Sequence, residues 1–254
     1  LIEQIHHNMM QGVRGQDKEP GRFRREQNYI APEGSTIEDA RYVPPSPLIM
    51  QDCLQNLEKY FKFSEVDPIV QAATIHAQFE IIHPFKDGNG RVGRILIPLY
   101  LFNKGVLRRP VLYLSDYLEA HHEEYAHRLL AITRDGDWDG WIEFFLKATT
   151  KQAEANTKTV EDIARLYDAM KARVVSATHS AHVVKFLDAI FGYPAFSARL
   201  FWRELNVNPR AGNRLLVLLC AEGIIRLAIK GRGSKPSIYL FPSLLDLANK
   251  RCFE

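Results

Sequence analysis

The sequence lacks several features that would assign a protein to a class at once. It has only three cysteines in 254 residues, Cys53, Cys220 and Cys252, which are far apart and form no CxxC pair. This number excludes a disulfide framework and favours a reducing, cytoplasmic compartment. The longest apolar stretches, such as residues 95–102, are far shorter than the roughly 20 residues of a membrane span, so no membrane partner is expected.

The chain also has little net charge and no internal repeats. Its formal net charge is +3, but this charge is unevenly distributed. Residues 182–254 hold eleven Lys and Arg against five Asp and Glu, whereas residues 1–181 hold 22 against 25. The asymmetry predicts two units, a slightly acidic domain over 1–181 and a basic domain over 182–254, with the boundary near residues 179–182.

Helical patterns dominate the first 181 residues. After a short initial helix, apolar spacing and end signals predict helices over residues 49–61, 68–82, 89–104, 116–134, 138–150 and 154–177. Turn residues at 32–35 separate two short predicted strands, Arg25–Ile30 and Ala40–Val43. The predicted fold class is therefore mainly α with one small β-hairpin.

Residues 83–94, His-Pro-Phe-Lys-Asp-Gly-Asn-Gly-Arg-Val-Gly-Arg, are the most informative segment. Gly88 and Gly90 let the backbone turn sharply, and a helix follows at once. The unpaired N–H groups of that helix would face the loop and attract an anion. Arg91 and Arg94 are three residues apart on one helix face, and each guanidinium can fork onto phosphate oxygens. The segment therefore suits a polyphosphate.

Two further side chains in this segment can supply chemistry. Asp87 offers a hard carboxylate, and Mg²⁺ commonly binds one or two carboxylates together with substrate phosphates. His83, at the end of the preceding helix, is a natural base near neutral pH. Alone, each feature has an ordinary reading as a helix cap, a turn or a solvated face, but their occurrence within twelve residues favours a site.

Residues 88–93 also fit the pattern GxGxxG. The dinucleotide-binding fingerprint requires a preceding strand and a βαβ unit, whereas a helix is predicted here on both sides. The sequence contains no GxxxxGK[ST] either, so a P-loop is excluded.

Residues 83–94 match the motif HxFx[DE]GNGRxxR at every specified position, and the segment therefore resembles the Fic family. Further segments resemble Fic-domain sequence, namely residues 21–30 (the family's N-terminal flap), 76–80, 112–117, Tyr125 and 138–146. The resemblance covers roughly residues 15–180.

The resemblance implies a protein adenylyltransferase, which transfers AMP from ATP to a Ser, Thr or Tyr hydroxyl of a target protein or of itself. His83 would accept the hydroxyl proton, and Asp87 would hold Mg²⁺. The flap would dock the target by β-augmentation. The family resemblance assigns the flap to Gln27, Asn28, Tyr29 and Ile30, and the nucleotide to Gly88, Asn89, Gly90, Arg91, Arg94 and Tyr125. Tyr125 is equally well read as a packed helix aromatic, and Arg22, Arg24 and Arg25 as a solvated basic face.

Alternative functions stay open at this point. The intact motif does not distinguish AMP transfer from AMP removal or from transfer of another nucleotide. Gly88 favours AMP transfer over phosphorylation, because relatives that phosphorylate carry a bulky residue there. A DNA-binding regulator whose Fic-like site senses nucleotide is a further hypothesis.

Regulation is expected to depend on a segment outside this sequence. Many Fic proteins carry an inhibitory helix with the pattern [ST]xxxE[GN], which this chain lacks. Since the chain starts at Leu1 rather than Met, we expect that helix upstream, and the chain as given to be deregulated.

The basic C-terminal part resembles a winged helix-turn-helix domain. Helices are predicted over Ser197–Leu205 and Arg210–Glu222, and strands over Ile224–Ile229 and Ser237–Phe241. Its predicted core is Phe201, Leu205, Leu215, Leu218 and Ile225. Its predicted phosphate-contacting surface is Arg210, Asn213 and Arg214 on the second helix and Lys230, Arg232 and Lys235 on the wing. DNA is one candidate partner; protein contacts, including a homodimer, are the other.

Overall fold

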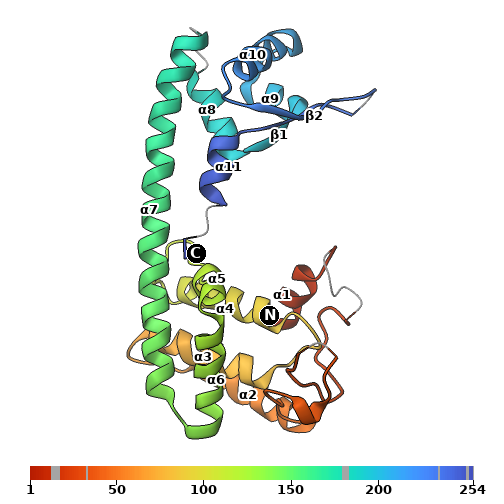
Figure 1. Ribbon diagram of the computed structural model, residues 1–254, viewed down its shortest axis with the longest axis vertical. Helices are drawn as coiled ribbons and strands as arrows, with labels where there is room; N and C mark the ends of the chain where they lie inside the picture. The colour runs from red at the N-terminus through yellow and green to blue at the C-terminus, as the bar shows by residue number, and fades with distance from the viewer. Residues whose placement is uncertain (13–17, 33, 179–182, 234, 250–251, 254) are drawn as a thin grey trace. The chain divides into compact units, whose positions relative to one another are not determined.

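The structure is a computed structural model that describes residues 1–12, 18–32, 34–178, 183–233, 235–249 and 252–253 (Figure 1). The described part is mainly helical, as the sequence predicts, and contains one small antiparallel sheet. No helix within these ranges is long and apolar enough to cross a membrane. The chain forms two compact units, Leu1–Glu154 with Phe253, and Ala155–Cys252. The predicted boundary at 179–182 lies outside the described residues.

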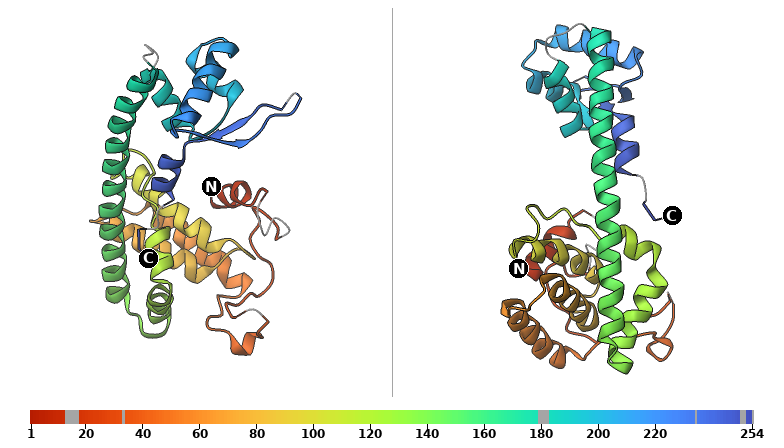
Figure 2. Two further views of the ribbon diagram at one scale, coloured as in Figure 1. Left: turned by 45° about the horizontal axis from the view of Figure 1, so that its top comes forward. Right: turned by 90° about the vertical axis from the view of Figure 1, so that its left-hand side faces the viewer.

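The first unit is a helical domain centred on α3 and α4, which lie next to each other in both views of Figure 2. Its elements are α1 (Ile2–Met9), η1 (Ile37–Asp39), α2 (Pro47–Lys62), α3 (Pro68–Ile82), α4 (Asn89–Asn103), α5 (Ser115–Ala120), α6 (His122–Asp135) and the first part of α7 (Trp138–Thr178). The start of α3 is fixed as predicted, because the Asp67 carboxylate accepts the N–H groups of Ile69 and Val70.

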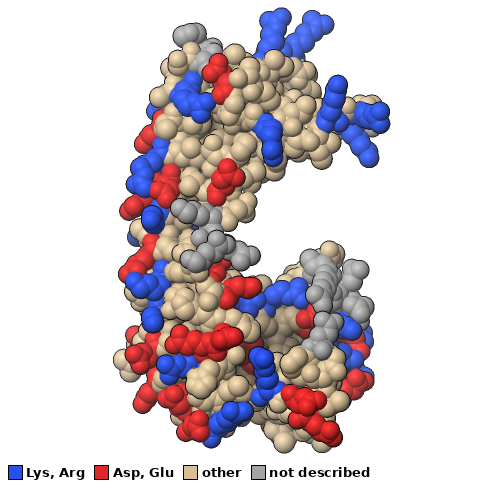
Figure 3. Space-filling model, in the orientation of Figure 1, with Lys and Arg blue, Asp and Glu red and all other residues tan. Residues whose placement is uncertain are grey.

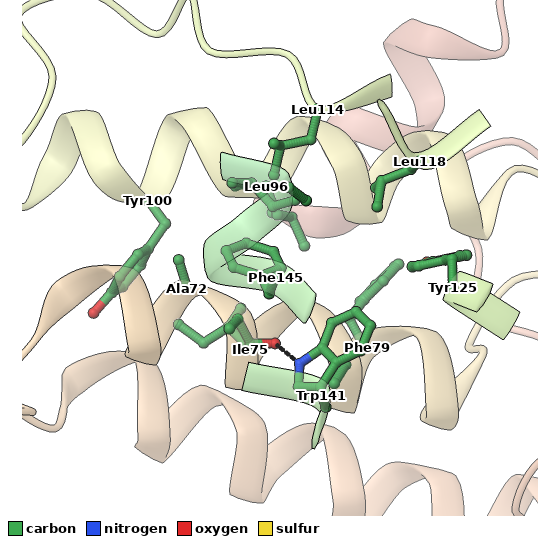
Figure 4. Packing of buried hydrophobic residues seen from close by; sticks show 14 of the residues in the cluster. Ala72, Ile75, Phe79, Leu96, Tyr100, Leu114, Leu118, Tyr125, Trp141 and Phe145 are labelled. Carbon is green, nitrogen blue, oxygen red and sulfur yellow. Dashed lines mark hydrogen bonds between the residues drawn. The ribbon is translucent and has the colours of Figure 1, made fainter. Parts of the chain in front are cut away.

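α3 is buried on several faces and forms the centre of the core. Ala72, Ile75 and Phe79 are at most 1% exposed. Trp141 and Phe145 of α7 pack against this helix, and the indole N–H of Trp141 donates to the carbonyl of Ala73 at 3.0 Å (Figure 4). A helix enclosed in this way gives its C-terminal end, where His83 lies, a fixed position.

The predicted helix over residues 116–134 is in fact two helices, α5 and α6. They meet at His121, whose backbone angles (φ −114°, ψ 34°) are not helical. The ring of His121 stacks on Tyr117 at 4.0 Å, and its Nδ1 donates to the Tyr117 carbonyl at 2.9 Å. A side chain that bonds to the backbone in this way competes with continuation of the helix.

The two predicted helices over 138–150 and 154–177 are one continuous helix, α7. The residues between them, Lys151-Gln152-Ala153, include no glycine or proline that would end a helix. Gln152 is polar but only 2% exposed, and its side chain accepts from the backbone N–H of Tyr117. A buried polar residue thus interrupts the apolar pattern without interrupting the helix.

The predicted hairpin strands over 25–30 and 40–43 are not formed as strands. One isolated antiparallel bridge joins Ile30 to Tyr42. In that register Asn28 would face Pro44 and Gln27 would face Pro45. Proline has no N–H to donate, so the ladder stops after one bridge. We keep the name flap for residues 21–30.

The second unit combines helices with a three-stranded antiparallel sheet in the order β1-β3-β2. It contains the last part of α7, α8 (Val183–Gly192), β1 (Ala195–Ser197), α9 (Ala198–Leu205), α10 (Pro209–Ala221), β2 (Arg226–Ile229), β3 (Ile238–Leu240) and α11 (Pro242–Ala248). Tyr239 pairs with Phe196 on one side and Leu227 on the other. Ser197 caps α9 as predicted, since its hydroxyl accepts the N–H of Leu200. The strand β1 and the helices α8 and α11 add to the predicted elements.

The core face of α10 is rotated from the prediction. Leu216 and Leu219 are fully buried, whereas Leu215 and Leu218 are only partly buried. The contact that sets this rotation is between Gly212 and the indole of Trp202, because a Cβ on Gly212 would lie only 2.3 Å from the ring. The predicted core residues Phe201, Leu205 and Ile225 are buried.

Candidate active site

His83 follows directly after the last residue of α3 and has a left-handed backbone (φ 50°, ψ 60°). Its backbone N–H still bonds to the carbonyl of Phe79, so it closes the helix. Left-handed angles are uncommon outside glycine and persist only where the surroundings hold them. The turn at His83 directs the chain from α3 into the loop that precedes α4.

The imidazole of His83 has a defined proton position. Its Nδ1 lies 3.2 Å from the carbonyl oxygen of Glu80. Because a carbonyl only accepts, Nδ1 must carry the proton, and Nε2 holds the free lone pair. Burial lowers the pKa of His83 to about 4, and the nearby charge of Arg24 acts in the same direction. The ring is therefore neutral and able to accept a proton at neutral pH.

The loop between the two helices is held by a side chain inside the motif. The Asn89 amide accepts the N–H of Phe85 and donates to the carbonyl of the same residue, both at 2.8 Å. Phe85 is fully buried, as predicted for an anchor. Gly88 has φ +84°, and a Cβ there would lie 3.1 Å from the Met10 sulfur. Gly88 is therefore required both by backbone conformation and by the close approach of α1.

The loop ends at the N-terminus of α4, where two arginines follow. Arg91 lies 3.5 Å from the carboxylate of Asp87, and both side chains are more than a third exposed. Arg94 covers Gly90, since a Cβ on that glycine would lie 3.0 Å from its guanidinium. The structure thus brings the predicted cations and the predicted carboxylate together at one helix N-terminus, which itself favours anions.

A buried polar cluster lies directly behind this loop. Burial raises the pKa of Glu80 to about 7, and Arg94 opposes the shift. The Glu80 Oε1 is buried without a hydrogen-bond partner and points at Gly93, where a Cβ would lie at 2.3 Å. His76, whose pKa burial lowers to about 4, bonds through Nε2 to the hydroxyl of Tyr125 at 3.0 Å. These groups form a polar layer under the second motif arginine.

Tyr125 is 9% exposed and packs near Trp141, with ring centroids 5.9 Å apart. It also lines a cavity of about 190 Å³ whose remaining walls are largely apolar. The cavity is lined by Ile30, Arg41, Tyr42, Glu80, Ile81, His122, Tyr125, Ala126, Leu129 and Leu130. The cavity thus joins the flap to the buried polar cluster.

The flap and Tyr42 donate hydrogen bonds to successive carbonyls at the end of α3 and in the loop. The Tyr42 hydroxyl, just beyond the flap, donates to the carbonyl of Ile81 at 2.9 Å. Arg24 donates to the next three carbonyls along the chain, and the Asn28 amide donates to that of Phe85 at 3.3 Å. Five successive carbonyls, from residue 81 to residue 85, are bonded in this way. The flap is therefore a cap for the helix that carries His83.

Arg24 corrects the prediction that the flap arginines form a solvated basic face. Arg22 and Arg25 are exposed, but Arg24 is only 2% exposed. The predicted docking residues behave differently from it. Tyr29 and Ile30 are about 40% exposed, at 42% and 39%, and Gln27 is exposed with its amide on the Pro44 carbonyl.

His6 of α1 contacts the site and was not identified from the sequence. Its ring stacks on Phe85 with centroids 3.8 Å apart and planes inclined by 9°. Its Nδ1 accepts the N–H of Gly21 at 2.8 Å, and its Nε2 donates to the carbonyl of Asp87 at 2.9 Å. The bond accepted at Nδ1 requires the neutral ring, and burial lowers the pKa of His6 in agreement with this. His6 thus connects the flap to the loop between α3 and α4.

The basic residues predicted on the second unit lie on its surface. Arg210 and Arg214 are exposed near the N-terminus of α10, and Lys230, Arg232 and Lys235 are exposed at the end of the β2–β3 hairpin. Figure 3 shows basic side chains on α10 and on the tip of this hairpin.

The part of the chain that contains this loop resembles known proteins. Residues 1–101 match the sequence model of the Fic/DOC family, and this segment contains the whole loop and both motif arginines. Residues 1–101 are therefore similar to Fic/DOC family domains. Over 94% of its length it resembles the crystal structure of a Fic family protein from Desulfovibrio desulfuricans G20, with a TM-score of 0.55 and 21% identity over 67% of that chain. This likeness supports the fold.

Curated relatives carry an activity in their names. A probable protein adenylyltransferase of Aquifex aeolicus, aq_aa38, is 33% identical over 88 residues, which is 34% of this chain and 28% of the relative. Protein adenylyltransferase fic-1 of Caenorhabditis elegans is 30% identical over 141 residues, or 54% of this chain and 24% of the relative. The chain thus spans about a quarter of the length of these relatives.

Proposed function

We propose that the first unit is a protein adenylyltransferase, which transfers AMP from ATP to a Ser, Thr or Tyr hydroxyl of a protein. One observation carries the proposal. The neutral ring of His83, with its Nε2 lone pair free, lies in the same short segment as an anion-binding helix N-terminus and two arginines. The names of the curated relatives agree with this activity.

The reaction is a direct displacement at the α-phosphorus. The target hydroxyl oxygen attacks this phosphorus and forms a new O–P bond. Its proton passes to Nε2 of His83. The bond from the α-phosphorus to the bridging oxygen breaks, and pyrophosphate leaves. Since the groups around the loop are already fixed, catalysis rests on positioning and on stabilisation of charge.

The nucleotide would lie along the N-terminus of α4. The backbone N–H groups at Gly88, Asn89 and Gly90 would face the α-phosphate. The side-chain amide of Asn89 would not, because it already bonds to Phe85. Arg91 and Arg94 would hold the pyrophosphate that leaves. The 190 Å³ cavity beside Tyr125 offers apolar walls to the base. This arrangement uses each residue that the sequence assigned to the nucleotide.

Asp87 fits a role as the protein ligand of Mg²⁺. Its side chain is 43% exposed and faces the loop N–H of Gly88 and the cation Arg91. No cluster of three metal-ligating side chains occurs among the described residues. One carboxylate plus phosphate oxygens and water is an arrangement that Mg²⁺ commonly adopts. The ion would neutralise phosphate charge when bound.

The flap would bind the target as an added strand. The bridge between Ile30 and Tyr42 leaves most main-chain groups of residues 25–29 without a partner strand. An extended target segment paired there would depend mainly on main-chain bonds, which tolerate many sequences. Its hydroxyl side chain would then reach His83.

We propose that the second unit is a winged helix-turn-helix module that binds DNA. Two helices, α9 and α10, precede the β2–β3 hairpin, and the exposed basic residues lie at the ends of α10 and of the hairpin (Figure 3). Basic side chains placed in this way can bind the phosphates of DNA, and the affinity of such binding falls as the salt concentration rises. Salt-dependent binding of duplex DNA, reduced in an Arg210/Arg214/Arg232 variant, would support it. Equal binding by the variant would contradict DNA binding through these residues and would favour a role of this surface in protein contacts.

The activity is tested with ATP labelled in the adenine ring. Protein-bound label should appear with the wild-type chain and Mg²⁺, on the chain itself or on an added protein fraction. His83→Ala should abolish it, and Asp87→Ala should reduce it strongly. Equal labelling by His83→Ala would refute the assigned base.

A further inference from the structure

Arg24 is a buried cation that bonds only to the backbone. Its Nε donates to the carbonyl of His83 at 2.9 Å, and its Nη2 reaches the carbonyls of Ile82 and Pro45. Its Nη1 donates to the carbonyl of Glu26 at 3.2 Å, and its own backbone N–H bonds to Pro84 at 2.8 Å. Among the described residues no carboxylate forms an ion pair with it.

This arrangement is costly for a residue that only fills space. Removing a guanidinium from water without a counter-ion is unfavourable, and an apolar side chain would fill the same volume without that cost. The bonds that compensate end on the segment that includes His83, on Glu26 of the flap and on Pro45, which lies just before the start of α2. The hydrogen bonds that offset the cost of burying Arg24 thus hold the segment in which His83 has left-handed backbone angles.

The charge of Arg24 also acts on the imidazole. The charges of Arg24 in the flap and Asp87 in the loop act in opposite directions on the protonation of His83. Burial has the largest effect on the pKa of His83, and Arg24 lowers it further. Loss of the guanidinium would therefore make the imidazolium form easier to reach.

We propose that Arg24 is a positioning residue of the transfer reaction, which fixes the backbone of residues 82–84 from the flap and thereby keeps the His83 imidazole aimed at the target hydroxyl. This inference rests on the proposed function, because it assigns His83 the role of base. It also connects the surface on which the target would dock to the group that accepts the target's proton.

The experiment compares Arg24→Gln and Arg24→Lys with Arg25→Gln, an exposed neighbour in the same segment. Arg24→Gln should lower kcat by about 10- to 100-fold with little change in KM for ATP, because misplacement of a reacting group by about 1 Å costs up to about 100-fold. The acidic limb of its pH–rate profile should move to higher pH. Arg24→Lys should lower kcat without moving the acidic limb, since lysine keeps the positive charge but lacks the planar set of N–H donors of the guanidinium.

A second measurement separates this inference from the proposed activity. NMR titration of the histidine ring in the full chain should give a higher pKa for His83 in Arg24→Gln than in wild type, and an unchanged one in Arg25→Gln. This holds whether or not AMP transfer is detected. Wild-type kcat in Arg24→Gln, an unchanged His83 pKa, or an unfolded Arg24→Gln chain together with a fully active Arg24→Lys chain would each overturn the positioning role.

Discussion

His6 and Phe85 stack face to face, with ring centroids 3.8 Å apart and planes inclined by only 9°. This contact joins α1 to the centre of the loop between α3 and α4. The two hydrogen bonds of the same imidazole, to Gly21 and to Asp87, extend the connection to the flap on one side and to the candidate metal ligand on the other. The loop is thus held from outside its own sequence.

His6→Phe tests this connection. The new ring keeps the stack but leaves a backbone N–H and a carbonyl unpaired in a buried place. The loss should destabilise the fold by about 1–3 kcal/mol and lower AMP transfer, because the carbonyl of Asp87 is released. Denaturant unfolding and initial rates measure both effects. His7→Phe, on the exposed neighbour, should change neither.

Glu80→Gln tests the polar layer through pH. The pKa of the Glu80 carboxyl is raised from 4.5 to about 7 by burial, so the folded chain holds a proton that the unfolded chain releases. The free energy of unfolding of the wild-type chain should therefore fall by about 3 kcal/mol through this group as the pH rises from about 4.5 to 7. The stability difference between Glu80→Gln and wild type should grow in favour of the variant between pH 5 and pH 8. A difference that stays constant over this range would show that Glu80 is ionised throughout.

Gly93→Ala tests the contact between the polar layer and α4. The new methyl group would lie 2.3 Å from the Glu80 Oε1, so the variant should lose about 1–3 kcal/mol of stability. In a Glu80→Ala background the same substitution should cost less, because the clashing atom is gone. Gly192→Ala is the control, since nothing lies within 4 Å of its Cβ position. Equal losses of stability in both backgrounds would show that the strain does not come from the contact with Glu80.

Trp141→Phe tests the packing that fixes α3. The fully buried indole donates to the carbonyl of Ala73, and phenylalanine would lose this hydrogen bond and leave a small cavity. We expect a loss of about 2–4 kcal/mol in denaturant unfolding. Trp138→Phe, at a partly buried position, should cost much less. Similar losses in the two variants would argue against a special role for this hydrogen bond.

The sequence was informative where the deciding interactions are local. Asp67 and Pro68 start α3, Gly105 follows α4, and Ser197 starts α9, each through contacts within a few residues. The motif is also continuous, so its chemistry could be assigned without knowing the fold.

Residues that act from a distance could not be assigned from the sequence alone. Arg24 and His6 bond to the motif from 59 and 81 positions away. In the sequence Arg24 is indistinguishable from its exposed neighbours Arg22 and Arg25. The orientation of α10 was not predicted for a similar reason. Several adjacent leucines make more than one face of this helix apolar, and the contact between Trp202 and Gly212 selects the face that is buried.

The position of the transferred label tests the central claim most directly. Wild-type chain is incubated with Mg²⁺ and with ATP labelled either at the α-phosphate or at the γ-phosphate. We expect protein-bound label from α-labelled ATP only, release of one pyrophosphate for each AMP transferred, and no label with His83→Ala. Protein-bound label from γ-labelled ATP, or equal α-labelling by His83→Ala, would contradict AMP transfer with His83 as its base.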